Sequence, residues 1–474
     1  MLNNNANKGL QLIALLAVAL TLGYFVSTAK WMVLASALGM ALLISGGFLN
    51  RWYGIVMLLT VAPVYGFLRY VIGLSNQQII IKEALVVLIT ASSLAVKIVL
   101  EKRTLKWYEF DKFLSIFLFM AFIQFLRSPD PIMGLLGIRI LATYIPLYYV
   151  VRYERPSNAQ IKTAILIVFI VLCLTTVYGL WQSAIGLTRL EEMGLAKVAT
   201  SMGVATKNNE MIRIFSTFAG PEYFGATLIF AVLLLISLWV TLDKVFVKIL
   251  FMAAIAMMIM AVGLTLVRLE WAMLAVGILV LGVATRNYRV IIGVMVLGLI
   301  AITFAPEAVV ERAKMSFGRE DESYTARKEV YLEWNIVNIG ENIVGTGIGT
   351  TNGASVYAKL SKRNVVSNLI GGGNTESWYT AIAIEMGIIG LIVYLGLWIL
   401  IIRHSFQIYM TSLNKYIKGL ALGYMSFACS MAIFNVVAPM PACFPAGDLY
   451  FWVLLGIITV MYEREQEELL LEQS

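Results

Sequence analysis

The chain has 474 residues, of which 60% are hydrophobic and only 14% are charged, and its mean hydropathy is +0.83. A soluble protein of this size could not bury so much apolar surface, so the composition excludes a soluble globular protein and indicates one that crosses a membrane many times. The net charge of +8 does not indicate a nucleic-acid partner, because basic residues between membrane spans usually set topology. We expect no nucleic-acid binding.

Apolar runs long enough to cross a bilayer, about 17 to 25 residues each, recur along the whole chain. There are about fourteen, which predicts an all-α polytopic membrane protein with about 12–14 transmembrane helices. The first run could pass for a signal peptide, but it lacks a small-residue cleavage site, so we expect it to remain as a helix. The predicted spans lie near residues 10–28, 31–49, 53–72, 79–99, 113–128, 132–151, 162–185, 219–241, 245–266, 269–285, 290–305, 377–402, 417–438 and 447–462.

Basic residues gather in alternate loops between these spans, which predicts that those loops and both termini are cytoplasmic. The segment 306–376 then lies on the outer face, and a connection of that length is usually functional. Within it Val330, Trp334 and Val337 recur at helical spacing. They predict an amphipathic helix over residues 324–339 on the outer surface. The basic loop residues include Arg51, Lys102, Arg103, Arg152, Arg155, Lys244, Lys248, Arg286, Arg403 and Lys415.

The single histidine and the cysteines carry no catalytic pattern. His404 falls at the cytoplasmic end of its span, so it is excluded from chemistry on the outer face and we expect it to be a solvated interfacial residue. The cysteines Cys173, Cys429 and Cys443 have no motif spacing. We therefore expect neither a disulfide framework nor a metal site.

Arginines within or beside the spans need a separate explanation, because charges in a bilayer are costly and are functional by default. Arg139 lies about two turns into a span, Arg213 lies where an outer linker becomes a span, and Arg268 lies at an outer turn. Arg327 lies in the long outer segment. The planar guanidinium matches phosphate oxygens and keeps its charge, so we predict a site for a membrane-embedded phosphate or diphosphate. Alternatively, each arginine extends to lipid headgroups or pairs with a carboxylate. The acids that could pair with them are Glu222, Glu270 and Glu210.

Two glutamates stand near the start of the span 377–402. Glu376 and Glu385 are nine residues apart, which places them on opposite helix faces and ~13 Å apart along the axis, too far for a close carboxylate pair. We expect Glu385 to be buried and structural, bonded to a neighbouring helix. Glu376 could accept a proton from a hydroxyl or complement the dipole at the helix N-terminus, and the residues alone leave both open.

Four segments together resemble the O-antigen ligase and polysaccharide polymerase family, which has many spans, outer arginines and one large extracytoplasmic loop. RIFSTFAGPEYFG resembles its arginine-then-glycine segment, with Glu222 where asparagine is usual. GLTLVRLEWAML resembles its threonine-x-serine-arginine segment, with Val267 replacing the serine. TARKEVYLEW and NIVGTGIGT resemble the loop's arginine and glycine-x-glycine. NTESWYTAIAIEMGIIGLIVY resembles the histidine-asparagine segment, with Glu376 at the histidine position. The resemblance covers residues 205–400 and is weaker at Arg139.

This resemblance implies an all-helical membrane glycosyltransferase that moves a glycan from a polyprenyl diphosphate carrier, such as undecaprenyl diphosphate, to a sugar hydroxyl on the outer face. Arginines would stabilise the leaving diphosphate, so we expect a metal-independent reaction without a cofactor. The expected site residues are Glu376 as base, Arg213, Arg268, Arg139 and Arg327 at the diphosphate, and Glu222 and Trp378 in support.

Replacement of the ligases' histidine by Glu376 favours a polymerase of exopolysaccharide, capsule or O-antigen repeat units over an O-antigen ligase to lipid A-core. The alternative from another class is a lipid-linked oligosaccharide flippase or an anion transporter. Such transporters place charges along a central cavity and have duplicated halves, which this sequence lacks. A cell-wall glycan polymerase of the shape, elongation and division type shares the architecture, but its acidic loop motif is not apparent.

The resemblance divides the chain into three regions: N-terminal helices in 1–204, the ligase-like core in 205–400 with the outer segment 306–376, and C-terminal helices with a cytoplasmic tail in 401–474. We expect a multi-pass protein of the bacterial cytoplasmic (inner) membrane with its active site on the extracytoplasmic face. Its expected partners are the lipid bilayer, a polyprenyl diphosphate-linked glycan donor and a glycan acceptor, with a chain-length regulator and a flippase as further candidates.

Overall fold

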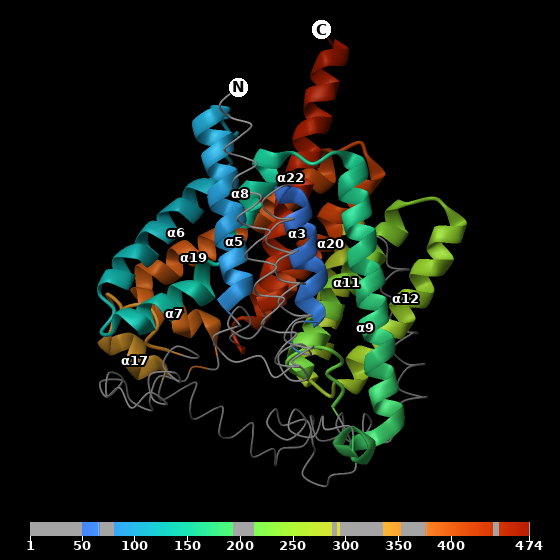
Figure 1. The fold of residues 1–474 in the computed structure, drawn as a ribbon, viewed down its shortest axis with the longest axis horizontal. Helices are drawn as coiled ribbons and strands as arrows, with labels where there is room; N and C mark the ends of the chain where they lie inside the picture. The colour runs from blue at the N-terminus through green and yellow to red at the C-terminus, as the bar shows by residue number, and fades with distance from the viewer. Residues whose placement is uncertain are drawn as a thin grey trace, which may run out of the picture.

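The computed structural model describes residues 50–64, 66, 80–192, 213–286, 292–293, 335–351, 375, 377–438 and 445–473. In these residues the regular structure is helical, and they form no strand (Figure 1). The main helices are α3 (Arg51–Val61), α5 (Ile80–Leu94), α6 (Glu109–Leu126), α7 (Pro131–Ala142), α8 (Ile145–Glu154), α9 (Asn158–Glu192), α11 (Pro221–Thr241), α12 (Val245–Leu264), α13 (Arg268–Thr285), α17 (Asn335–Glu341), α19 (Trp378–Thr411), α20 (Lys415–Phe434) and α22 (Pro445–Gln473). A short 3-10 turn (Ala62–Val64) follows α3, and a π-helical turn (Ala95–Leu100) follows α5.

The chain is an all-α polytopic membrane protein, as its composition predicts. Among the described residues, six helices are long and apolar enough to cross a membrane, or up to seven if the bent pair α7 and α8 counts as one span. These six are α9 as far as Gly186, α11, α12, α13, α19 and α20. The predicted spans 10–28 and 31–49 lie outside the described residues, as does 290–305 except for residues 292–293.

Helix α11 forms the centre of the bundle. The most apolar window of α11 is 83% buried, whereas that of α12 is 22% buried, so α12 presents most of its surface outward. Helices α12, α13 and α20 all pack against α11. Small residues permit close approach: a Cβ on Gly423 would lie 2.4 Å from Ser237 Oγ, and one on Gly277 would lie 2.4 Å from a methyl group of Leu233.

The predicted span over residues 132–151 consists of two helices. Helices α7 and α8 meet at a bend of 48°. Pro146 is the second residue of α8, and its ring lacks an N–H and clashes with the carbonyl four residues earlier, which ends α7 at Ala142. The connection over residues 186–218, between the predicted spans 162–185 and 219–241, begins as a helix, because α9 continues to Glu192 beyond a break at Gly186, where φ is 78°.

Basic loop residues gather at one end of the bundle, called here the basic end. Arg51 pairs with Glu154 at 3.3 Å and Arg155 pairs with Glu467 at 2.6 Å. The carboxylate of Glu465 accepts the main-chain N–H of Leu413, which lies in the turn between α19 and α20. The charged end of α22 thereby contacts loops from both halves of the chain, and in Figure 1 it projects at the top of the molecule.

His404 lies near the basic end, but it is not solvated as predicted. Its side chain is 6% exposed and its Nε2 lies 3.1 Å from the hydroxyl of Thr459. The rings of Tyr108 and Phe110 lie 4.4 and 4.9 Å from the imidazole, centroid to centroid. The prediction failed because α22 and the start of α6 cover the end of α19, a tertiary contact that the hydropathy of one span cannot indicate.

Arg152 is the largest of the fully buried side chains at this end, and it is 1% exposed. Its guanidinium lies 3.3 Å from an oxygen of Asp111 and 2.6 Å from one of Glu463, and it donates to the Tyr148 hydroxyl at 2.9 Å. It therefore joins α6, α8 and α22 through charge-assisted bonds that water does not screen.

Arg152→Met should lower the free energy of unfolding by about 3–5 kcal/mol, because it leaves buried carboxylates without their cation. Arg155→Met is the matched control: its ion pair with Glu467 is exposed and should contribute at most about 1 kcal/mol. Chemical denaturation of the purified protein in detergent measures both. Equal losses for the two variants would contradict the structural role of Arg152.

Candidate active site

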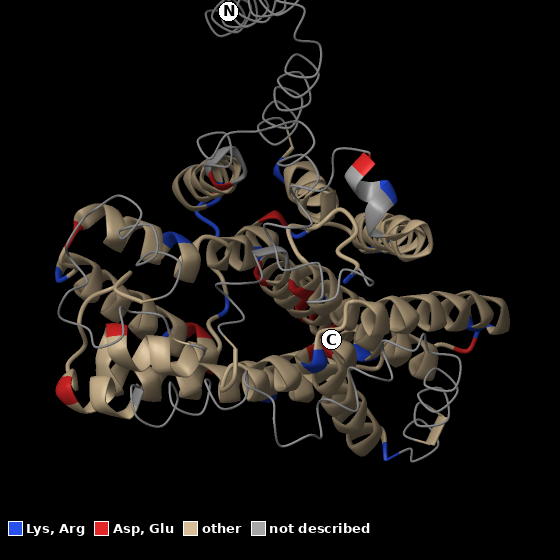
Figure 2. Cartoon of the chain, turned by 90° about the horizontal axis from the view of Figure 1, so that it is seen from below, with Lys and Arg blue, Asp and Glu red and all other residues tan. Residues whose placement is uncertain are grey.

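Several helix starts meet at the opposite end of the bundle, which we call the α17 end. Here Trp378 N, at the start of α19, donates to Asn435 O at the end of α20, at 2.9 Å. Ser430 near the end of α20 donates to the carbonyl of Met273 near the start of α13 at 3.0 Å. Figure 2 views the molecule from this side and shows how few charged residues interrupt the apolar helices. Helix N-termini carry partial positive charge, so this end favours anions.

Helix α19 is broken near the α17 end at Gly387, whose φ is 76° and ψ is 176°. Glycine tolerates this conformation because it has no Cβ, and a Cβ here would lie 2.4 Å from Ile343 O. The break frees the carbonyls of the preceding turn. Thr346 N donates to Ile384 O at 2.8 Å and Gly347 N donates to Glu385 O at 3.1 Å. The loop after α17 therefore completes the hydrogen bonding of the broken helix.

The Glu385 side chain holds the same loop. Its Oε1 accepts the main-chain N–H of Thr351 at 2.9 Å and the Thr351 hydroxyl at 2.6 Å. The prediction that Glu385 bonds a neighbouring helix is therefore wrong in its partner, which is a loop. The predicted amphipathic helix at 324–339 is described only from residue 335, and Val337 is 43% exposed.

The glycine-x-glycine motif of this loop serves packing. Gly347 and Gly349 have φ values of +100° and +88°, and a Cβ on Gly349 would lie 2.1 Å from Met133 O in α7. On the neighbouring side Ile348 N donates to Gln124 O at 3.1 Å, and Gln124 Nε2 donates to Val344 O at 2.7 Å. The motif thus fits between α6, α7 and α19, where only glycine leaves room for the backbone.

Arg213 and Arg268 belong to two segments that lie side by side. Ile214 N donates to Leu264 O at 3.2 Å, and Arg213 Nε donates to Thr265 O at 3.1 Å. Arg268 begins α13, three residues after Thr265. Both arginines are half-buried. The turn between α12 and α13 thereby brings together the segments of two arginines that are 55 residues apart in the sequence (268 − 213).

Arg213 also has an acidic partner, which was the alternative interpretation of the sequence. Its Nη2 lies 3.4 Å from Glu222 Oε1, a long contact in which the Glu222 side chain is 49% exposed. A guanidinium has five N–H groups, and the bonds to Thr265 and Glu222 use two of them. Arg213 can therefore donate to a further anion, and an exposed pair of this length contributes little stability.

Thr265 and Glu270 complete this cluster, and neither is among the predicted site residues. The Thr265 hydroxyl donates to Glu270 Oε2 at 2.7 Å. Glu270 is 1% exposed and its carboxylate fills a notch at Gly225, where a Cβ would lie 1.7 Å from Oε2. Glu270 could have been predicted from the sequence, because it is an acid in the first turn of α13, two residues after Arg268 (270 − 268). This contact fixes the turn against α11.

Arg139 lies apart from that cluster in its contacts. Its Nε and Nη2 donate to Glu83 Oε1 at 3.2 and 2.8 Å, which joins the last turn of α7 to the first turn of α5. No hydrogen bond or ion pair between Arg139 and either Arg213 or Arg268 occurs among the described residues. Arg327 and Glu376, the predicted base, lie outside the described residues.

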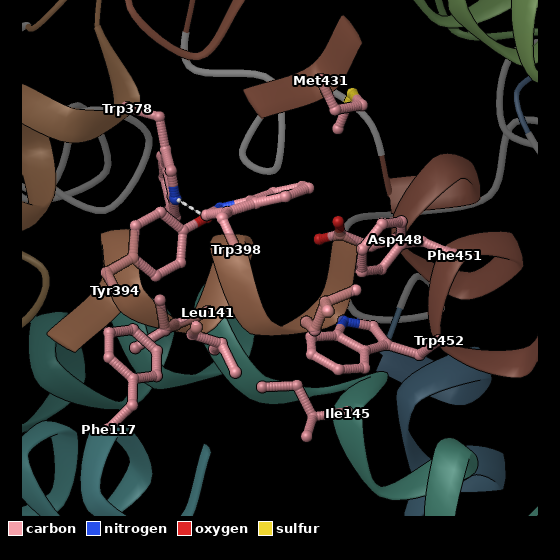
Figure 3. A pocket seen from close by; sticks show the side chains of 12 residues that line it. Phe117, Leu141, Ile145, Trp378, Tyr394, Trp398, Met431, Asp448, Phe451 and Trp452 are labelled. Atoms are coloured by element: carbon pink, nitrogen blue, oxygen red, sulfur yellow. Dashed lines mark hydrogen bonds between the residues drawn. The ribbon is translucent and has the colours of Figure 1, made fainter. Parts of the chain in front are cut away.

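Trp378 lies in the wall of a small cavity beside the entrance of α19 (Figure 3). Its indole Nε1 donates to the Tyr394 hydroxyl at 2.9 Å. The cavity has a volume of about 40 Å³, and among the described residues Asp448 in the first turn of α22 is the only charged one that lines it. Asp448 was not among the predicted site residues, although an acid at the start of a predicted span is a functional signal.

The comparisons with known proteins identify the central part of the chain. Residues 253–395 match the family model described as O-antigen ligase. The match runs from within α12, through Arg268, into α19 beyond Glu376, and it does not include Arg139 or Arg213. No curated protein matches the chain. This match, which covers less than half of the chain, supports a relationship to the O-antigen ligase and polymerase family, whose members are glycosyltransferase-like membrane enzymes.

Proposed function

We propose that this protein is a polymerase of lipid-linked polysaccharide repeat units of an exopolysaccharide, a capsule or an O-antigen. The observation that carries the proposal is the pairing of the Arg213 and Arg268 segments through the turn at Thr265, at the end where α11 and α13 begin. Two guanidinium groups and two helix N-termini favour a diphosphate over any monovalent group. A polyprenyl diphosphate would lie there with its tail among the lipids.

The reaction is the transfer of a glycan to a hydroxyl of another glycan. The acceptor oxygen forms a bond to the anomeric carbon, and the bond from that carbon to the diphosphate oxygen breaks with its electron pair remaining on the diphosphate. Arg213 and Arg268 stabilise the charge that develops on the leaving group. The hydroxyl proton passes to a carboxylate base. Arg139 and Arg327 are secondary candidates at the diphosphate.

Glu376 is the proposed base, in line with its position in the family segment. Its neighbours in the chain are both buried: Thr375 is 2% and Ser377 is 3% exposed. The Ser377 side chain caps α19 by accepting Thr380 N at 3.3 Å, and its hydroxyl donates to Asn435 O at 3.2 Å. The backbone on either side of Glu376 is thus anchored, which suits a group that must meet a hydroxyl at hydrogen-bond distance. Glu222 and Trp378 support the site, and Glu222 is the next candidate for the base.

Two rival functions differ from a polymerase in what they do to the lipid-linked glycan. An O-antigen ligase would make a single transfer to lipid A-core and would not lengthen the lipid-linked chain. A lipid-linked oligosaccharide flippase or an anion transporter would move its substrate without forming a bond. The absence of the ligases' histidine at Glu376 favours the polymerase.

The orientation of the protein follows from the basic end. Positive charge in short loops favours the cytoplasmic side, so Leu413, 69% exposed at the basic end, should face the cytoplasm, and Ile336, 61% exposed in α17, should face outward. Cysteine replaces each in turn, in a background lacking the three native cysteines. A membrane-impermeant thiol reagent on intact cells should label position 336 alone. Labelling of position 413 alone would reverse the proposed orientation.

Arg268→Lys and Arg213→Ala should each reduce polymerisation about 10²–10³-fold, the usual effect of removing one preorganised donor to a developing anion. Arg268→Lys keeps the charge but loses the planar fork. Arg286→Lys is the matched control, because Arg286 caps the opposite end of the same helix α13 and should leave the rate unchanged. Polymer yield per mole of purified protein is measured. Normal polymer from both arginine variants would remove the diphosphate role.

Glu376→Gln should fold and insert normally but polymerise about 10²–10⁴-fold more slowly, the usual contribution of a general base. A role at the helix dipole alone predicts a loss of only ~0.3–1 kcal/mol of stability. Glu376→His should retain measurable activity, because imidazole is also a base. Glu385→Gln is the matched control: it keeps an oxygen that accepts from Thr351 and should alter stability more than rate. Parent-like polymerisation by Glu376→Gln would transfer the role to Glu222, tested in the same assay by Glu222→Gln.

A further inference from the structure

The cavity next to the entrance of α19 has rigid aromatic walls. Trp378, Tyr394, Trp398 and Phe451 line it, and each has its position fixed by a neighbour. Tyr394 receives the Trp378 N–H at 2.9 Å, the Tyr394 and Trp398 rings meet edge to face at 6.2 Å, and Trp398 lies 5.3 Å from Phe451, centroid to centroid. The space is therefore formed before any ligand enters.

Asp448 gives this apolar cavity a single strong acceptor. Its carboxylate points into the space between Trp398 and Phe451 (Figure 3). No hydrogen-bond donor or cation reaches that carboxylate within the part of the chain that the structure describes, and the N–H of nearby Trp378 is already used by Tyr394. Asp448 is half-buried, and a carboxylate among apolar side chains is costly unless a donor binds it. A ligand group that fits this cavity therefore has an O–H donor for the carboxylate and an apolar surface for the aromatic walls.

The volume and the position of the cavity limit the kind of group that could bind in it. The enclosed space of about 40 Å³ holds roughly three water molecules, which suits one hydroxyl-bearing arm of a sugar. Trp378 in its wall is two residues after Glu376 in the chain (378 − 376), so the cavity adjoins the segment that leads to the proposed base. The base meets the acceptor hydroxyl, which points to the acceptor sugar and not to the diphosphate-linked donor.

We propose that this cavity is an acceptor subsite, in which one hydroxyl or hydroxymethyl arm of the acceptor sugar lies against the aromatic walls and donates its hydrogen bond to Asp448. The inference rests on the proposed glycosyl transfer and adds a specificity-determining residue to it. An acceptor sugar that lacks this hydroxyl would leave the Asp448 carboxylate unpaired and would be rejected.

Asp448→Asn tests the subsite, since the amide keeps the shape of the side chain but loses the charged acceptor. The probe is the repeat-unit oligosaccharide released from its own lipid carrier by mild acid. Its binding to the purified full-length protein is followed by the fluorescence of the cavity tryptophans. We expect the dissociation constant, and the KM for the acceptor, to rise about 10–100-fold, in keeping with the loss of a hydrogen bond to a charged group, while kcat changes less than three-fold.

Asp243→Asn is the matched control for loss of one carboxylate. It lies at the basic end, where the ammonium group of Lys415 lowers the pKa of Asp243, so its side chain is ionised at neutral pH. This variant should bind and polymerise like the parent. A thermal melt of each variant verifies folding, and Asp448→Glu, which restores the charge, provides a second variant that should regain part of the binding.

The outcomes separate the subsite from the proposed function. Binding of the oligosaccharide by Asp448→Asn as tightly as by the parent would overturn the subsite while leaving polymerisation intact. A collapse of kcat with an unchanged KM would make Asp448 a catalytic group and would also overturn it. Failure of the proposed function has a different signature, because the parent protein itself would then form no polymer.

Discussion

The broken helix α19 imposes the constraint on which the α17 end depends. Within a bilayer every backbone polar group needs an internal partner, and the break at Gly387 deprives the carbonyls of Ile384 and Glu385 of theirs. The loop after α17 supplies the missing N–H groups, and the Glu385 side chain binds Thr351 in the same loop. The long segment 306–376 is therefore anchored on its helix at this point, and its continuation leads to the residues before Trp378.

Other contacts of this kind join the helices at the α17 end. The glycine-x-glycine motif lies between α6, α7 and α19, and the turn at Thr265 joins α12 and α13 to the segment that carries Arg213. Glu270 fastens the same turn against Gly225 of α11. The opposite end relies on a different device, the buried Arg152 with its two carboxylates, which ties α22 to the N-terminal half.

Hydropathy and charge predicted most of the fold, because helix length and loop basicity are local properties of a membrane chain. The bend before Pro146 was not predicted, although the proline is a local signal for it, since proline cannot continue the preceding helix. The candidate site was predictable only in part. Arg213 and Arg268 were recognisable as charges beside apolar runs, but the pairing of their two segments depends on a turn at Thr265. The buried state of His404, the loop partner of Glu385 and the cavity around Asp448 arise from contacts between distant segments, and no periodicity encodes them.

The central claim is that the α17 end breaks a bond to a polyprenyl diphosphate and forms a new glycosidic bond. The most direct measurement places the purified protein in lipid nanodiscs with a defined polyprenyl diphosphate-linked repeat unit and follows both products by mass spectrometry. The account predicts a ladder of lengthened lipid-linked glycans, with one free polyprenyl diphosphate released for each new glycosidic bond. Release of polyprenyl diphosphate without a longer glycan, or recovery of the substrate unchanged from a protein that still moves it across vesicle membranes, would contradict the account.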